Sequence, residues 1–102
     1  MDDLKRRIET GNFAVNNGAV IRTVNILNGN WIKYDVLKSV LDFVPMQNLI
    51  YLQRAGYIDV RYSASKEKIY VEDASCDDVE IALTSDGMKL AVCVITDEAV
   101  II

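Results

Sequence analysis

Four polar side chains with recognition chemistry lie in one short stretch of the sequence, VPMQNLIYLQRAG (residues 44–56). They are Gln47, Asn48, Tyr51 and Arg54. Glutamine and asparagine amides can form paired hydrogen bonds with adenine, and arginine can contact phosphate. At helical spacing these side chains fall opposite the apolar ones, so we expect the polar groups outside. The side chains expected inside are Met46, Leu49, Ile50 and Leu52. Any amphipathic surface helix would show a similar pattern, and that alternative stays open.

Positive charge is concentrated around this stretch. Through Val71 the chain has ten lysines and arginines against seven acids, and from Glu72 onward it has one lysine against eight acids. Six cations near the helix and the following hairpin are expected to contact DNA phosphates. They are Lys33, Lys38, Arg54, Arg61, Lys66 and Lys68. The acidic last third must then face away from DNA, although two ordinary solvated surfaces would give the same charge pattern.

Catalytic and metal-binding groups are not indicated. The chain has no histidine, and Cys76 and Cys93 stand far apart without a CxxC motif, so we expect free thiols and no metal site. There is no Gly-rich phosphate loop and no serine nucleophile signature, so neither a catalytic residue nor a cofactor is expected. No apolar run is long enough to span a bilayer, and the start lacks a secretion signal. We therefore expect a cytoplasmic protein that is not an enzyme.

The recognition stretch is expected to sit among helices that form most of one domain, residues 1–102. A short helix is expected at residues 2–10, ending at Gly11, and the domain core at about residues 16–94 begins with a second helix over about 16–27. After a brief strand near Trp31, a third helix over about 34–43 carries apolar residues in adjacent rows, including Val36 and Val40, that should face the core. The fourth helix occupies about residues 45–55, with Pro45 in its first turn and Gly56 as its left-handed stop.

A hairpin and a short helix are expected to follow. YIDVRYS alternates like a half-buried strand, SASKEK reads as a turn, and VEIALT reads as a further strand. Whether residues 69–72 form a strand of this hairpin stays open. Thr84 or Ser85 is the expected N-cap of the last helix. The apolar tail, residues 95–102, should pack as an edge strand or against a partner.

This order of elements is typical of the winged helix-turn-helix, an α+β fold with a helical bundle and a small antiparallel wing. The phrases YLQRAGYIDVR and VEIALTSDGMKLA resemble the pattern that winged-helix domains share, over about residues 16–94. With NNGAVIR, NGNWIKYDVLK and TDEAVII, the whole chain resembles the small winged-helix proteins of Mu-like phages and prophages.

The resemblance implies a transcriptional regulator that binds double-stranded DNA, with the helix at about residues 45–55 in the major groove. Gln47, Asn48 and Tyr51 would contact bases, and the six cations would hold the backbone. The apolar composition also favours a homodimer. The competing hypothesis is a winged-helix module for protein interaction or dimerisation, without DNA binding.

Overall fold

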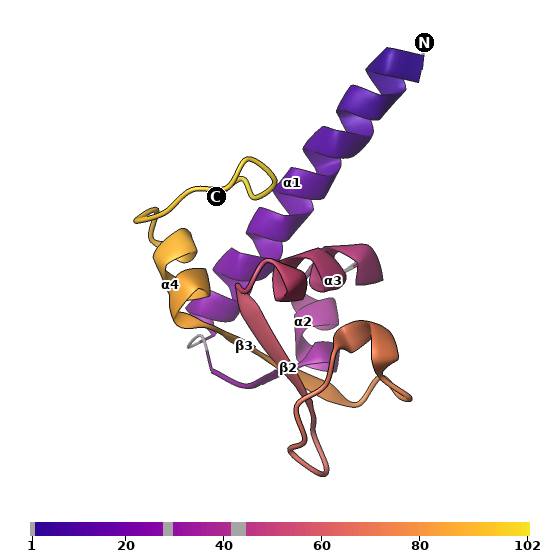
Figure 1. Cartoon of the computed structure of the whole chain (residues 1–102), viewed down its shortest axis with the longest axis vertical. Helices are drawn as coiled ribbons and strands as arrows, with labels where there is room; N and C mark the ends of the chain where they lie inside the picture. The colour runs from indigo at the N-terminus through magenta and orange to yellow at the C-terminus, as the bar shows by residue number, and fades with distance from the viewer. Residues whose placement is uncertain (1, 28–29, 42–44) are drawn as a thin grey trace.

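The chain folds into an α+β arrangement in which a long helix supports a small antiparallel sheet and three shorter helices (Figure 1). The computed structural model describes residues 2–27, 30–41 and 45–102, with residues 2–11 as backbone only. Within these ranges the order is α1 (Asp2–Ile26), β1 (Ile32–Lys33), α2 (Tyr34–Leu41), α3 (Met46–Arg54), β2 (Ile58–Tyr62), the 3-10 turn η1 (Val71–Asp73), β3 (Val79–Leu83) and α4 (Ser85–Ala91).

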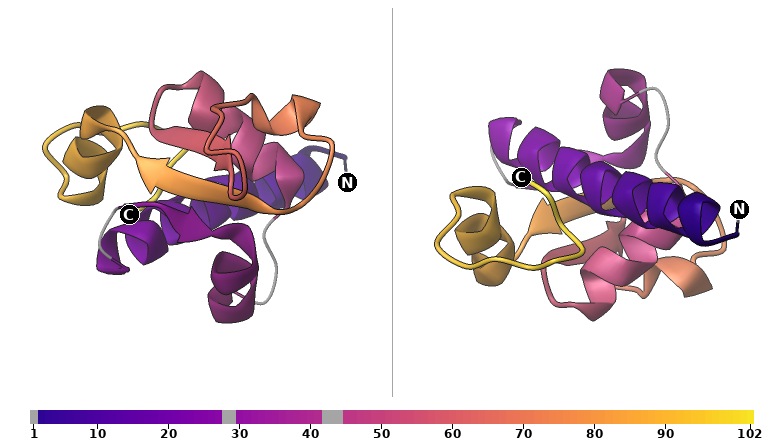
Figure 2. Two further views of the ribbon diagram at one scale, coloured as in Figure 1. Left: turned by 90° about the horizontal axis from the view of Figure 1, so that it is seen from below. Right: turned by 90° about the horizontal axis from the view of Figure 1, so that it is seen from above.

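The sheet has the order β1-β3-β2, so the last strand in the sequence lies in the middle. Ile81 of β3 pairs with Ile32 on one side and with Val60 on the other, and all pairs are antiparallel. Every residue of β3 is buried. Helix α1 contacts β3 and each of the other three helices, which makes it the spine of the core (Figure 2).

Helix α1 is continuous, so the prediction of two helices interrupted at Gly11 is wrong. A glycine in a helix interior costs only about 1 kcal/mol relative to alanine, and the neighbouring residues continue the helix on both sides. The N-terminal half of α1 extends past α3 and past the tail, away from the rest of the fold (Figure 1).

Helices α2 and α3 follow one another closely, as the sequence predicted. The buried face of α2 and the start of α3 differ from the prediction. On α2 Leu37 is fully buried, whereas Val36 and Val40 are exposed, so the expected inward rows are only partly correct. Residues 42 and 43 of the expected helix lie outside the described residues. Pro45 has an extended backbone and precedes the first turn of α3, and Gly56 ends the helix at φ +84° as predicted.

The segment between β2 and β3 folds back onto α3, and residues 69–72 do not form a wing strand. Lys68 makes an isolated bridge to Arg61, and η1 follows. The Gln53 side chain donates to the carbonyl of Ile69 (2.7 Å) and accepts from the Val71 amide (2.8 Å). The Gln53 side chain thus makes the backbone hydrogen bonds that a neighbouring strand would make, and it holds the segment against the end of α3.

The C-terminal tail packs on α1 of its own chain, so the edge-strand prediction is wrong. The Ile101 amide donates to the Ala14 carbonyl (3.0 Å), and Val100 is 5% exposed. A Cβ on Gly18 would lie 1.6 Å from the Ile101 carbonyl oxygen, so the tail needs a glycine at this point of α1. The N-cap prediction for α4 is confirmed, since Thr84 accepts from the Gly87 amide.

None of the helices in the described ranges combines the length and the hydropathy that a membrane crossing would need.

Candidate functional site

Asn48, expected to point outward, is instead one of the most buried polar residues, at 2% exposure. Its side-chain amide donates to the Phe13 carbonyl (3.1 Å) and to Oδ1 of Asn17 (2.8 Å). Asn17 in turn donates to the Ala99 carbonyl in the tail (2.8 Å). The outward placement was wrong because periodicity treats every polar residue as solvated, whereas a buried amide with its hydrogen bonds made is stable inside. Asn48 joins α3 to α1 and cannot reach a base edge from there.

Tyr51, a second expected base contact, has its hydroxyl engaged inside the protein. It donates to Oδ2 of Asp97 (2.7 Å), and Tyr57 donates to the same oxygen (2.7 Å). The Tyr51 ring also meets the Phe13 ring edge-on, with centroids 5.5 Å apart. The tail, α3 and the residue that precedes β2 therefore meet around one carboxylate, and α1 contacts this group through the Phe13 ring.

The pKa values of these three groups reflect their contact. Burial and the hydrogen bond to Asp97 raise the pKa of Tyr51 to about 12, and the hydrogen bond to Asp97 with burial raises the pKa of Tyr57 to about 12. Burial acts to raise the pKa of Asp97, but the hydrogen bonds from both tyrosines and from the Ala99 amide outweigh it and lower the pKa. Sequence reasoning missed Asp97, whose only signal was its place in the short polar stretch Thr96–Glu98 within an otherwise apolar tail.

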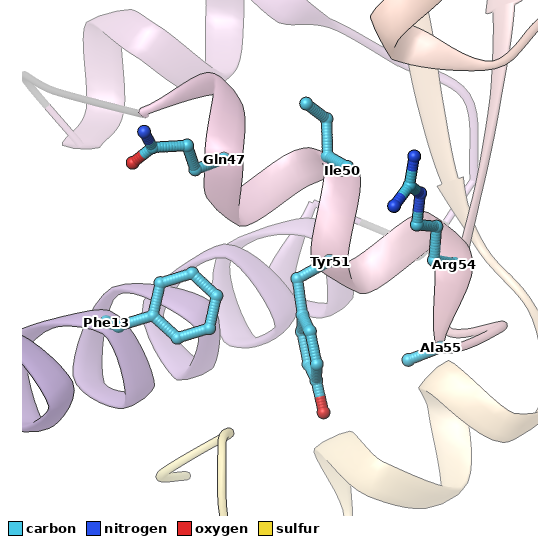
Figure 3. Close-up of a pocket in the computed structure, with 6 residues that line it drawn as sticks. All are labelled: Phe13, Gln47, Ile50, Tyr51, Arg54 and Ala55. Atoms are coloured by element: carbon cyan, nitrogen blue, oxygen red, sulfur yellow. The ribbon is translucent and has the colours of Figure 1, made fainter.

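An open groove runs along the solvent side of α3 (Figure 3). Its volume is about 510 Å³, and its lining residues are Phe13, Gln47, Ile50, Tyr51, Arg54 and Ala55. Phe13 comes from α1 and the others from α3 or its end, so the groove lies where α1 leaves the body of the protein. Its walls are mostly carbon. Of the three expected base contacts, Gln47 is the exposed one.

Most of the cations expected to hold DNA phosphates contact carboxylates of the same chain. Arg54 pairs with Glu72 (2.8 Å), and Lys68 lies 3.8 Å from Asp59. On α2, Lys38 pairs with Asp35 (3.4 Å), while Lys33 on β1 is exposed.

The two remaining cations, Arg61 and Lys66, converge on Glu80, which is 8% exposed. Both contact Oε1 of Glu80, at 2.8 Å for Arg61 and 3.2 Å for Lys66, and the Arg61 guanidinium stacks on Trp31 at 4.0 Å. Burial acts to raise the pKa of Glu80, but these two hydrogen bonds and charges outweigh it and lower the pKa. Arg61 is thus held by a buried carboxylate and a ring, not presented to solvent.

The charge of the whole wing region is negative. Residues 59–78 contain three cations and six acids. Because the cations lie beside carboxylates, the potential that a phosphate backbone would meet at this surface is weak.

Comparison with protein-family models, with curated proteins and with solved structures gave no match.

Proposed function

We propose that this is a winged-helix protein that docks an apolar helix of a protein partner along α3. The tight α2–α3 pair, the sheet order β1-β3-β2 and the long β2–β3 connection support the winged-helix assignment. The groove beside α3 is the observation that carries the docking function. Grooves of this kind bind amphipathic helices through apolar side chains spaced three or four residues apart.

The distribution of charge favours a protein over a nucleic acid as the main ligand. Binding to duplex DNA draws most of its affinity from phosphates neutralised by lysine and arginine. The groove has one cation, Arg54, whose guanidinium lies against Glu72, and the wing beside it is net acidic. The apolar floor around Ile50 and Phe13 gains more from an apolar partner, because its burial releases water from carbon surface.

Selection of helical peptides tests the docking function. A library of amphipathic helical peptides is panned on the wild-type protein, on Ile50→Arg and on the matched control Val40→Arg. Ile50 lines the groove, whereas Val40 is an exposed apolar residue on α2, outside the groove lining. We expect the selected peptides to bind the wild type and Val40→Arg, and not to bind Ile50→Arg. Equal binding to all three folded proteins would remove the groove from any docking role.

Double-stranded DNA is the second candidate ligand, as for a phage or prophage transcriptional regulator. It is favoured by exposed Gln47 on α3 and by exposed side chains of Arg54 (68%), Lys66 (55%) and Lys68 (71%). Surface ion pairs are worth only about 0–1 kcal/mol, so phosphates can replace the carboxylates. Both functions are compatible with the expected cytoplasmic location.

A gel shift on DNA at several salt concentrations tests this second candidate. The phosphate model expects log K to fall steeply with log salt, and expects weaker binding after Arg54→Glu and Lys68→Glu. A binding constant that does not change with salt, or binding that is unchanged by both substitutions, would rule out the phosphate model and leave protein docking as the one remaining candidate.

A further inference from the structure

The groove on α3 lies between two segments that reach this helix from opposite sides. On one side η1 packs against α3, where Arg54 pairs with Glu72 at 2.8 Å. On the other side the tail meets α3 through the hydrogen bond from Tyr51 to Asp97. Arg54 and Tyr51 both line the groove, and they point away from α3 in opposite directions (Figure 3). A helix docked in the groove therefore has η1 along one edge and the tail along the other.

Both flanking segments are acidic. Glu72 and Asp73 belong to η1, and Asp97 and Glu98 lie in the tail. Among the described residues that line the groove, Arg54 is the one cation, so the flanks and the lining together hold four acids against one cation. Residues 2–11 of α1 contain three acids and three cations, which leaves this balance unchanged. The surroundings of the groove are therefore negative, while its lining is mostly carbon.

Three of the four flanking acids leave negative charge that is not matched by a cation of the described residues. Glu72 is matched by Arg54, whereas Asp73 and Glu98 are exposed and form no ion pair within the described ranges. Burial acts to raise the pKa of Asp97, but the hydrogen bonds that it accepts lower it, so this carboxylate is charged at neutral pH. Each flank thus offers a negative charge to whatever lies in the groove.

We propose that the partner helix in this groove is a basic amphipathic helix. Its apolar stripe lies on the carbon surface around Phe13 and Ile50, and lysine or arginine side chains at the two edges of the stripe lie over η1 and the tail. The inference rests on the proposed function, because it names the chemical class of the partner that the groove takes. An acidic helix, like a phosphate backbone, is repelled by the same flanks.

Lysine and arginine suit the edges of the groove for a second reason. Their methylene chains pack on apolar surface while the charged ends extend outward, so one side chain covers carbon and reaches the flank. The nine residues of α3 span about 13 Å, so the docked helix makes about two and a half turns along it, with about two cations at each edge of its stripe. An exposed ion pair strengthens binding by roughly fivefold or less, and two or three such pairs together give about tenfold.

The sequences of the peptides panned on the wild-type protein give the first test. We expect lysine and arginine to exceed aspartate and glutamate at the positions that flank the apolar stripe. The side of each peptide opposite the stripe faces solvent and serves as an internal control, because its composition should match that of the starting library.

Three synthetic helices measure the preference directly, by fluorescence anisotropy on the full chain. They share one leucine stripe and one hydrocarbon staple on the opposite side, and their stripe-flanking positions are all lysine, all glutamine or all glutamate. Circular dichroism establishes that the three are equally helical. We expect the lysine peptide to bind about tenfold more tightly than the glutamine peptide, and the glutamate peptide to bind most weakly. The advantage of the lysine peptide should shrink as salt is added.

Neutralising the flanks should remove the preference. The double variant Glu72→Gln with Glu98→Gln takes one charge from each flank and keeps the shape of both side chains. The matched control, Glu67→Gln with Asp77→Asn, removes two exposed acids of the β2–β3 connection that do not line the groove. We expect the flank variant to weaken binding of the lysine peptide by about fivefold and to leave the glutamine peptide unchanged, and the control to change either by about twofold at most. Circular dichroism melting establishes that both variants are folded.

The results separate this inference from the docking function. Peptides that bind the wild type but not Ile50→Arg, with equal affinity for the lysine, glutamine and glutamate forms, overturn the basic partner and leave the docking function standing. A lysine preference that the flank variant reduces no more than the control also overturns the inference, because the attraction then comes from the net charge of the whole chain, −4. If no peptide, panned or synthetic, depends on Ile50, both claims fail together.

Discussion

Replacing Gly18 by alanine should detach the C-terminal tail from α1. The added Cβ would lie 1.6 Å from the Ile101 carbonyl oxygen and 2.5 Å from its carbonyl carbon, and these are backbone atoms that no rotamer change can move aside. The tail around Ile101 must therefore lift. Its contacts with α1, and through Asp97 with Tyr51 and Tyr57, are then weakened.

The expected loss of stability follows from these contacts. Exposing Val100, now 5% exposed, costs about 1.5–3 kcal/mol. Losing the hydrogen bonds from the Ile101 amide to Ala14 and from Asn17 to Ala99 costs about 1 kcal/mol each. Alanine in a helix interior returns about 1 kcal/mol relative to glycine, which leaves a net destabilisation of about 2.5–4 kcal/mol.

Urea unfolding followed by far-ultraviolet circular dichroism measures this change in the free energy of unfolding. Asn25→Ala, an exposed substitution in the last turn of the same helix, is the control and should change stability by only a few tenths of a kcal/mol. If Gly18→Ala matches or exceeds the wild type in stability, the helix-propensity gain is the whole effect. The tail would then not be seated against Gly18.

Two further perturbations test contacts around α3. Because the folded pKa values of Tyr51 and Tyr57 are about 12, their contribution to stability is complete below about pH 10, the usual tyrosine pKa, and is lost as pH rises toward 12. Asp97 acts with the opposite sign, since its lowered pKa gives stability above the unfolded value near 4 that is lost at lower pH. Titration of tyrosinate absorbance should show two late-ionising tyrosines that shift down in Asp97→Asn, and a single common step in the wild type would contradict the shared hydrogen bonds. Gln53→Ala should lower the free energy of unfolding in urea by about 1–3 kcal/mol, because the Ile69 carbonyl and the Val71 amide lose their hydrogen-bond partner. An unchanged unfolding midpoint would mean that the Gln53 amide does not hold η1 in place.

Local sequence signals were sufficient for elements whose cause is local. The glycine at position 56 ends α3 because its backbone adopts φ +84°, and Thr84 begins α4 because its hydroxyl caps the first turn. The alternation in YIDVRYS and the strand-like composition of VEIALT correctly predicted the strands at residues 58–62 and 79–83. The predicted α+β class follows from the order of these elements, and the structure agrees with it at that level.

The side-chain environment around α3 could be decided only by the tertiary structure. Asn48 and Tyr51 look solvent-facing at helical spacing, yet Asn17 and Asp97, 31 and 46 residues away, supply hydrogen bonds that make their burial favourable. The placement of two cations was also decided by the tertiary structure, because the sheet brings Glu80 on the central strand within ion-pair distance of Arg61 and Lys66. The sequence by itself determined most of the helical and extended segments, since those preferences act over a few residues, although it wrongly placed a break at Gly11 of α1. Only the tertiary structure decided which polar groups remain available to a ligand. Their hydrogen-bond and ion-pair partners come from segments far apart in the chain, and folding brings those segments together.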